Sequence, residues 1–264
     1  MNILNFNIYS FVTIGFWTVG LYFLFFPLKD KYSNLGYIIT ILGTVVLSLF
    51  MVLFWIKIKQ PNFRTITETF IWISLLISIS GFIIFLFLKY KWFLIVCHFI
   101  SLLILIYILF NKSGIGLFYK PILQSKWFIP HVLIYLSAYA LLSCAFIFNI
   151  IAIFKSFQLN DIQRYLRLTD LFVITGFILL SLGLIFGAFW AKDAWGHYWT
   201  WDVKQSWSLL TWIIYLIYIH LQYYQPSKYK INLWIILVAY LVLLISWVGY
   251  SILPTTLNSM HNFQ

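Results

Sequence analysis

Residues 195–207 concentrate side chains that could hold a large flat ligand. These thirteen residues contain four tryptophans, a glycine and an acid: Trp195, Gly196, Trp199, Trp201, Asp202 and Trp207. Indole rings bind planar molecules by stacking, and their N–H groups donate hydrogen bonds. Tryptophan is also common at membrane surfaces, and two long apolar runs flank this segment. An aromatic belt explains one or two such residues but not this density, so the pattern favours an aromatic shelf for a planar ligand.

The elements that must position this shelf are membrane-spanning helices. Hydrophobic residues make up 63% of the 264 residues and charged residues 9%, against about one quarter charged in a soluble domain. Because a crossing needs ~20 apolar residues whose backbone groups bond within their own segment, we expect an all-α polytopic membrane protein. Its bundle of about eight transmembrane helices would comprise residues 8–26, 35–56, 69–88, 92–110, 130–154, 171–190, 208–223 and 231–253.

The distribution of positive charge predicts the orientation. The net charge of +11 does not indicate nucleic-acid binding, because the cations are spread thinly through loops. After residue 131, one side of the membrane would hold Lys155, Arg164, Arg167, Lys228 and Lys230, and the other only Lys192 and Lys204. The positive-inside rule then places residues 195–207 on the extracytoplasmic side. Six cations of the first half contradict the rule on an eight-helix count, so either those loops neutralise a ligand or the count is wrong there.

The motif W-G-x-x-W-x-W-D-x-x-x-x-W at residues 195–207 resembles the tryptophan-rich (WWD) signature of haem-handling membrane proteins of cytochrome c assembly. The chain is most similar to the CcsA (ResC) family, strongly over residues 121–223 and weakly at the ends. Family members commonly carry proline and glutamate where this chain has Val203 and Gln205, which leaves the loop's rigidity and one hydrogen bond open. We expect one integral membrane domain, with N-terminal helices at 1–110 and a haem-handling core at 111–264 whose tryptophan-rich loop spans 191–207.

The resemblance assigns two external histidines to the haem iron. The family's P-x-L-Q-S-x-W element matches Pro121, Leu123, Gln124, Ser125 and Trp127. His131 follows it, at the first turn of a helix that would begin at Pro130, and matches an external axial ligand. Met260, His261 and Phe263 loosely resemble the element that carries the second external ligand, which would be His261.

A third histidine is assigned to haem inside the membrane. Trp212, Tyr218 and His220 match the family pattern W-x-x-x-x-x-Y-x-H. His220 would lie ~20 Å along its helix from Trp207. An ionisable group at such depth usually faces a bundle interior or a pathway.

Other residues of the segment receive supporting roles. Gly196 would let the backbone approach the macrocycle closely. Asp202 would orient an indole N–H or a histidine, since an acid beside the haem propionates would repel them. Lys192 and Lys204 are candidate partners of those propionates.

The resemblance thus implies that haem b is handled as a substrate. It would enter from the cytoplasmic side past His220, be held outside by His131 and His261, and be presented to the C-x-x-C-H thiols of apocytochrome c. The chain would be one subunit of a system II cytochrome c synthase (haem lyase), acting with a CcsB/ResB-type membrane protein. We expect it in a bacterial plasma membrane, with a thylakoid membrane as the alternative.

Two other functions remain open. A CcmC-type protein delivers haem without attaching it and shares the motif, but usually has six helices. A non-catalytic membrane scaffold would be colourless, whereas both haem interpretations predict a Soret band. Elsewhere, we expect His98 to be a packing residue, Glu68 to follow a threonine N-cap, and Cys97 and Cys144 to be small core residues because they lack C-x-x-C spacing.

Overall fold

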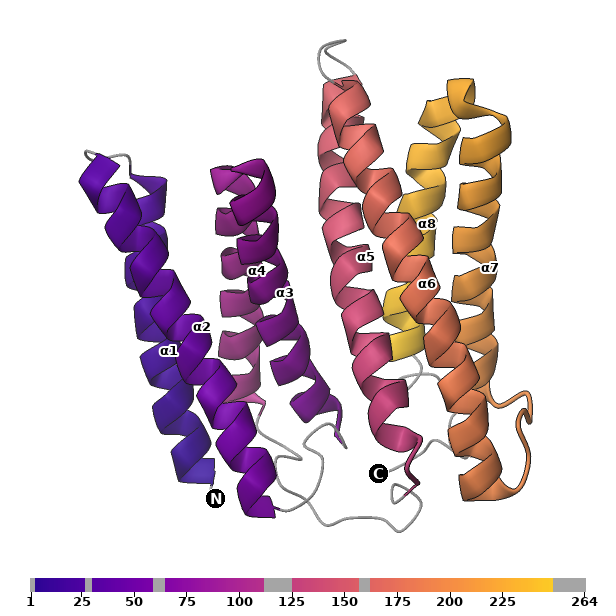
Figure 1. The fold of residues 1–264 in the computed structure, drawn as a ribbon, viewed down its shortest axis with the longest axis horizontal. Coiled ribbons are helices and arrows are strands. Elements are labelled where there is room, and N and C mark those ends of the chain that lie inside the picture. The colour runs from indigo at the N-terminus through magenta and orange to yellow at the C-terminus, as the bar shows by residue number, and fades with distance from the viewer. Residues whose placement is uncertain (1–2, 27–29, 59–64, 112–124, 157–161, 249–264) are drawn as a thin grey trace. The chain divides into compact units, whose positions relative to one another are not determined.

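The computed structural model describes residues 3–26, 30–58, 65–111, 125–156 and 162–248. These residues form eight α-helices and one short 3-10 helix (Figure 1). In chain order they are α1 (Ile3–Phe25), α2 (Asp30–Ile58), α3 (Ile66–Leu88), α4 (Lys91–Phe110), α5 (Phe128–Ser156), α6 (Ile162–Trp195), α7 (Val203–Tyr224), η2 (Pro226–Lys228) and α8 (Tyr229–Trp247). The expected all-α fold is confirmed.

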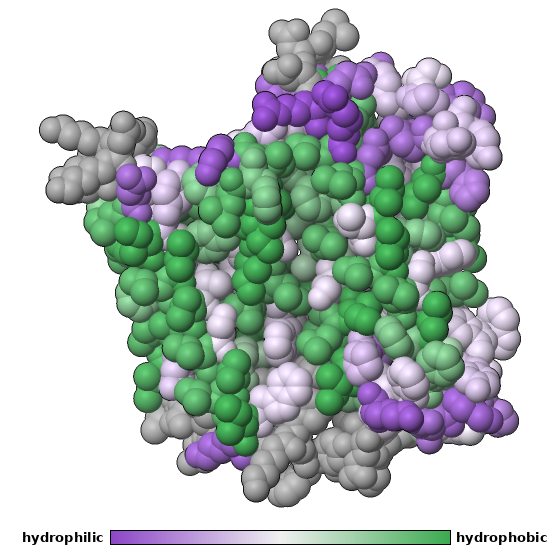
Figure 2. All heavy atoms as spheres, in the orientation of Figure 1, coloured by the Kyte–Doolittle hydropathy of each residue, from purple (hydrophilic) through white to green (hydrophobic). Residues whose placement is uncertain are grey.

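Most of these helices suit a bilayer. Within the described ranges, seven helices are long and apolar enough to cross a membrane, and α7 is the exception. α7 has sufficient length, but side chains such as Lys204, His220 and Gln222 make it more polar. Figure 2 shows hydrophobic residues along the visible sides of the helices and hydrophilic residues near their ends. Because so many large apolar side chains are exposed, lipid must be their solvent, and the protein is an integral membrane protein.

Helix contacts divide the chain into two compact units, residues 1–119 and residues 120–264, which we describe separately. Unit 1 contains α1 to α4. Its His98 is fully buried, lies edge-on to Trp17 and Phe82, and bonds through Nδ1 to the carbonyl of Leu94 at 3.0 Å. These contacts fit a packing role.

Two further features of unit 1 concern its helix ends and its surface. Thr65 caps α3, and its hydroxyl accepts a hydrogen bond from the backbone N–H of the buried Glu68 at 3.2 Å.

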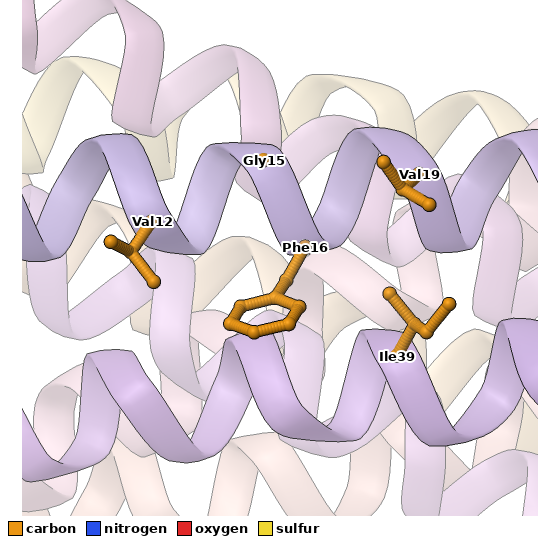
Figure 3. Close-up of a pocket in the computed structure, with 5 residues that line it drawn as sticks. All are labelled: Val12, Gly15, Phe16, Val19 and Ile39. Carbon is orange, nitrogen blue, oxygen red and sulfur yellow. The ribbon is translucent and has the colours of Figure 1, made fainter.

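An apolar groove lies between α1 and α2, lined by Val12, Gly15, Phe16, Val19 and Ile39 (Figure 3). No other atom lies within 4 Å of where a Gly15 side chain would begin. Lipid chains suit this surface.

Unit 2 contains α5 to α8, and a row of glycines on α6 lets α5 pack closely. A Cβ added at Gly176, Gly183 or Gly187 would lie 2.7 Å from a side-chain atom of Leu142, Tyr135 or His131, respectively. Small residues are the usual means by which membrane helices approach one another. α8 packs on α5, and α7 packs on α6 and α8. The start of α5, the end of α6 and the start of α7 therefore meet at one end of unit 2 (Figure 1).

Candidate functional site

The tryptophan-rich segment is mostly helical. α6 continues through Trp195 and α7 begins at Val203, so only residues 196–202 are irregular. The expected loop over 191–207 was too long. Gly196 ends α6, with a φ of 82° and its N–H bonded to the carbonyl of Lys192 at 3.0 Å. Glycine is favoured at this position because left-handed backbone costs it nothing.

Asp202 and Gln205 fix the start of α7. The Asp202 carboxylate accepts the backbone N–H of Lys204 at 3.0 Å, and the Gln205 side chain completes a capping box. Gln205 Oε1 also accepts the backbone N–H of Thr200 at 2.9 Å and that of Asp202 at 3.4 Å. Gln205 thus ties down the loop between α6 and α7. Asp202 acts as a helix cap here, a role different from the expected one.

The aromatic rings do not form a flat shelf. The rings of Trp199 and Trp201 are 5.8 Å apart and nearly perpendicular, at 86°. Trp195 meets Trp190 at 4.9 Å and 61°. Edge-to-face contact is preferred between aromatic rings because a negative face attracts a positive edge. Trp207 lies on α7 and is half-buried.

One tryptophan of the segment is strained and one has an unused donor. Trp201 has a φ of 56°, which is costly for a bulky residue, and 71% of its surface is exposed. Trp199 Nε1 is buried and has no hydrogen-bond partner in the described structure. A buried, unsatisfied donor costs about 1–3 kcal/mol. Both features suit a site completed by a ligand that carries an acceptor.

The two candidate propionate partners differ in their surroundings. Lys192 Nζ donates to the Gly196 carbonyl at 2.7 Å and lies 5.5 Å from the centre of the Tyr198 ring, so it braces the loop. Lys204 is half-buried just before the apolar part of α7. Burial lowers the pKa of its ammonium from 10.5 to about 8, and the nearby Asp202 carboxylate opposes that shift. Lys204 remains the better anion partner.

His131 occupies a well-defined position against α6. α5 begins at Phe128, two residues before the expected Pro130, and His131 still lies in its first turn. His131 Nδ1 bonds to the carbonyl of Gly183 at 2.9 Å. The imidazole stacks on Trp190 at 5.6 Å and 18°, and Tyr135 meets it edge-on at 4.9 Å. We call His131, Tyr135, Gly183, Gly187 and Trp190 the His131 cluster.

The hydrogen bond to Gly183 determines the form of the imidazole. A carbonyl oxygen only accepts, so the Nδ1 atom of His131 carries the proton. Nε2 then holds the lone pair, which is the form of neutral histidine that binds a metal. Metal-binding histidines commonly have their other nitrogen fixed in this way.

Sequence reasoning missed most of the residues around His131. Gly183, Gly187 and Trp190 received no role, although their spacing of four and then three places them on one helix face. It also missed the Ser125 hydroxyl, which donates to Asp193 at 2.7 Å and ties the start of α5 to the end of α6.

The other two histidines are placed differently. His220 lies on an exposed face of α7, not in the interior of unit 2, and its Nδ1 bonds to the carbonyl of Leu216 in its own helix at 3.0 Å. His261 lies outside the described residues, so its pairing with His131 stays a prediction.

Comparison with known proteins identifies the family. The sequence model described as "Cytochrome C assembly protein" matches residues 6–258. The chain belongs to the cytochrome c assembly protein family.

Three relatives, each named cytochrome c biogenesis protein CcsA, illustrate the similarity. The protein of Mesostigma viride is 32% identical over 171 residues, covering 53% of this chain and 56% of the relative. That of Chlamydomonas reinhardtii is 31% identical, covering 54% and 43%. The match to the protein of Helianthus annuus, at 25% identity, covers 90% and 78%. The chain thus spans about half the length of the first two relatives.

Proposed function

We propose that this cytochrome c assembly protein is the haem-handling subunit of a cytochrome c synthase, and that haem b is its substrate. The observation that carries the proposal is the His131 cluster. It holds one imidazole by a hydrogen bond from Nδ1 to the Gly183 carbonyl, at the end of unit 2 where the tryptophan-rich segment lies. Lysines and arginines from α5 to α8 are more numerous at the opposite end of unit 2. By the positive-inside rule, this distribution supports an extracytoplasmic position for the end that holds the His131 cluster, in a bacterial plasma membrane or a thylakoid membrane.

The residues present fit a bound haem. His131 would supply one axial ligand, and His261 is proposed as the other. The rings of Trp195, Trp199 and Trp201 provide apolar faces and edges for the porphyrin. The unpaired Trp199 N–H and the Lys204 ammonium would donate to its carboxylates.

The contribution of the protein to the reaction is orientation. Haem supplies vinyl groups, and the thiols of the apocytochrome C-x-x-C-H motif add across them. The imidazole, fixed by Gly183 and Trp190, would hold the iron, and contacts of the porphyrin edge with the tryptophans and Lys204 would limit the rotation that sets the direction of the vinyl groups. Orientation of two reactants can contribute roughly 7–11 kcal/mol to lowering a barrier.

The exposed face of α7 supports a partner protein. Leu210, Ile213, Ile217, His220 and Tyr224 are exposed and recur every three or four residues. An imidazole facing lipid alone would be costly. A helix of a CcsB/ResB-type membrane protein would cover this stripe, and haem would pass His220 on its way to the external site.

Co-expression with such a partner and a reporter apocytochrome c tests the proposal. His131→Ala is expected to abolish covalent haem on the reporter, and added imidazole to restore part of it. His197→Ala is the matched control, because His197 is exposed in the segment between α6 and α7 and has no assigned role. Undiminished attachment in His131→Ala would refute the ligand role.

The same experiment separates the alternatives. A coloured protein that never yields covalent haem, even with its partner, would indicate CcmC-like delivery. A colourless protein would indicate a scaffold.

A further inference from the structure

We propose that Asp170 is a positioning residue for His220, acting through a hydrogen-bonded network that fixes the rotation of α7. This inference rests on the proposed role of His220 and adds residues for which the sequence suggested no function. The network lies at the end of unit 2 opposite the His131 cluster, where α6 begins and α7 ends (Figure 1).

Asp170 joins α6 to α7 through both of its carboxylate oxygens. The Tyr218 hydroxyl donates to Oδ1, and Gln222 Nε2 donates to Oδ2 at 3.0 Å. Tyr218 and Gln222 are four residues apart, so they lie on one face of α7. Hydrogen bonds to a charged acceptor are stronger than those between neutral groups.

The network continues into α8. Gln222 Oε1 accepts from Asn232 Nδ2 at 2.6 Å, and Asn232 is 1% exposed. Tyr218 is also almost fully buried, at 2% exposed. Three helices are therefore joined through polar side chains in an apolar protein, and α7 is the only one that contributes two of them.

The geometry of the helix links this network to His220. His220 is two residues from Tyr218 and two from Gln222, which is about 200° around an α-helix in either direction. When Tyr218 and Gln222 face α6 and α8, His220 must face outward. The structure shows this arrangement, with His220 exposed and its Nδ1 bonded to its own helix.

Further contacts fix the start and the middle of α7. The capping box at Asp202 and Gln205 lies at its start. Trp212 Nε1 donates to Ser181 Oγ at 2.8 Å in the middle of the helix. Near His220, α7 is tied to α6 through Asp170 and to α8 through Asn232. Because Asp170 accepts hydrogen bonds from both Tyr218 and Gln222, loss of its carboxylate should release this part of α7 from α6 and misdirect the imidazole while the His131 cluster keeps its structure.

The test measures haem in the full chain co-purified with its partner, in a His131→Ala background that empties the external site. His220→Ala defines the haem fraction that depends on His220. Asp170→Ala is expected to lower that fraction about tenfold or more, since it removes two hydrogen bonds to a charged group.

Asp170→Asn is the conservative control and should retain most of the haem. The introduced amide oxygen can still accept from Tyr218. Its amide nitrogen can donate to Gln222 Oε1 if the Gln222 and Asn232 amides both flip. Gln222 Nε2 then donates to Asn232 Oδ1, which has no partner in the described structure.

Each outcome has one meaning. If His220→Ala leaves the haem unchanged, the proposed role of His220 fails. If His220→Ala removes the haem and Asp170→Ala does not, the positioning role is overturned. If Asp170→Ala also abolishes external haem binding in the chain with His131 intact, that substitution damages the fold. Tyr218→Phe then decides. The inference stands only if Tyr218→Phe lowers the His220-dependent haem and leaves haem binding at the external site unchanged.

Discussion

The two ends of unit 2 carry histidines in opposite settings. His131 is held by another helix, through the Gly183 carbonyl and the Trp190 ring. His220 contacts its own helix through Leu216 and is otherwise presented outward. Both carry a proton on Nδ1, because each Nδ1 bonds to a carbonyl oxygen, which can only accept.

This difference indicates a different use for each imidazole. A ligand fixed by packing and a second hydrogen bond can orient what it binds, as a reaction with defined stereochemistry requires. A ligand on an exposed helix face is incomplete by itself and depends on a second surface. We therefore propose orientation of haem for the His131 end and transfer of haem for the His220 end.

The sharpest test of this division is His220→Ala. We expect haem in protein purified from cells to fall at least tenfold, because supply through the membrane is interrupted. The same protein should bind haemin added in detergent with nearly unchanged affinity, since the His131 cluster is intact. Absorbance titration measures this, and loss of haemin binding would break the division.

Gly187→Ala tests the opposite end. The added methyl group would lie 2.7 Å from His131 Cε1, so the ring must move and lose its bond to Gly183 or its stacking on Trp190. We expect roughly tenfold weaker haemin binding, corresponding to one hydrogen bond of ~1 kcal/mol and part of the stacking.

Gly15→Ala is the matched control for that substitution, because its methyl group would meet no atom within 4 Å. Unchanged haemin affinity in Gly187→Ala would show that the imidazole tolerates displacement and is not fixed by this cluster.

Trp190→Leu should have a smaller effect. It removes an aromatic contact that contributes about 0.5–1.5 kcal/mol, so haemin affinity should fall roughly two- to tenfold. Trp190→Phe should lose less, because it retains an aromatic face. The thermal unfolding temperatures of both variants without haem would show whether a loss of affinity comes from a damaged core. Equal haemin affinity in Trp190→Leu and Trp190→Phe would argue against stacking.

The smallest expected effect is a pH dependence from Lys204. Its ammonium, with a pKa of about 8, should attract propionates below pH 8 and lose that attraction above it. Haemin affinity should therefore fall a few-fold as the pH rises through 8. Lys204→Met should remove this step.

Unfolding cannot produce the same signal. An unfolded lysine keeps its proton up to a pKa of ~10.4, so between pH 8 and that value the unfolded chain binds more protons. Rising pH then increases the contribution of Lys204 to stability while it weakens binding. An affinity that is flat across pH 8 would remove Lys204 from the site.

The sequence predicted the helices better than the packing between them. Apolar runs of sufficient length and the element before His131 are local signals, and both led to the observed helices. The ring angles of Trp199 and Trp201, the outward face of His220 and the glycine row facing His131 depend on how helices pack. Gln205 shows the same limit, because the pattern left open whether it makes a capping bond, and the structure contains that bond.

The central claim is that His131 Nε2 binds the haem iron, and one measurement tests it directly. His131→Gly would leave a space for free imidazole, and electron–nuclear double resonance can detect nitrogen bound to iron. With added 15N-imidazole, we predict a 15N coupling that replaces the coupling of the native histidine. If His131→Gly without added imidazole gives the same iron spectrum as the unmodified protein, the claim is contradicted.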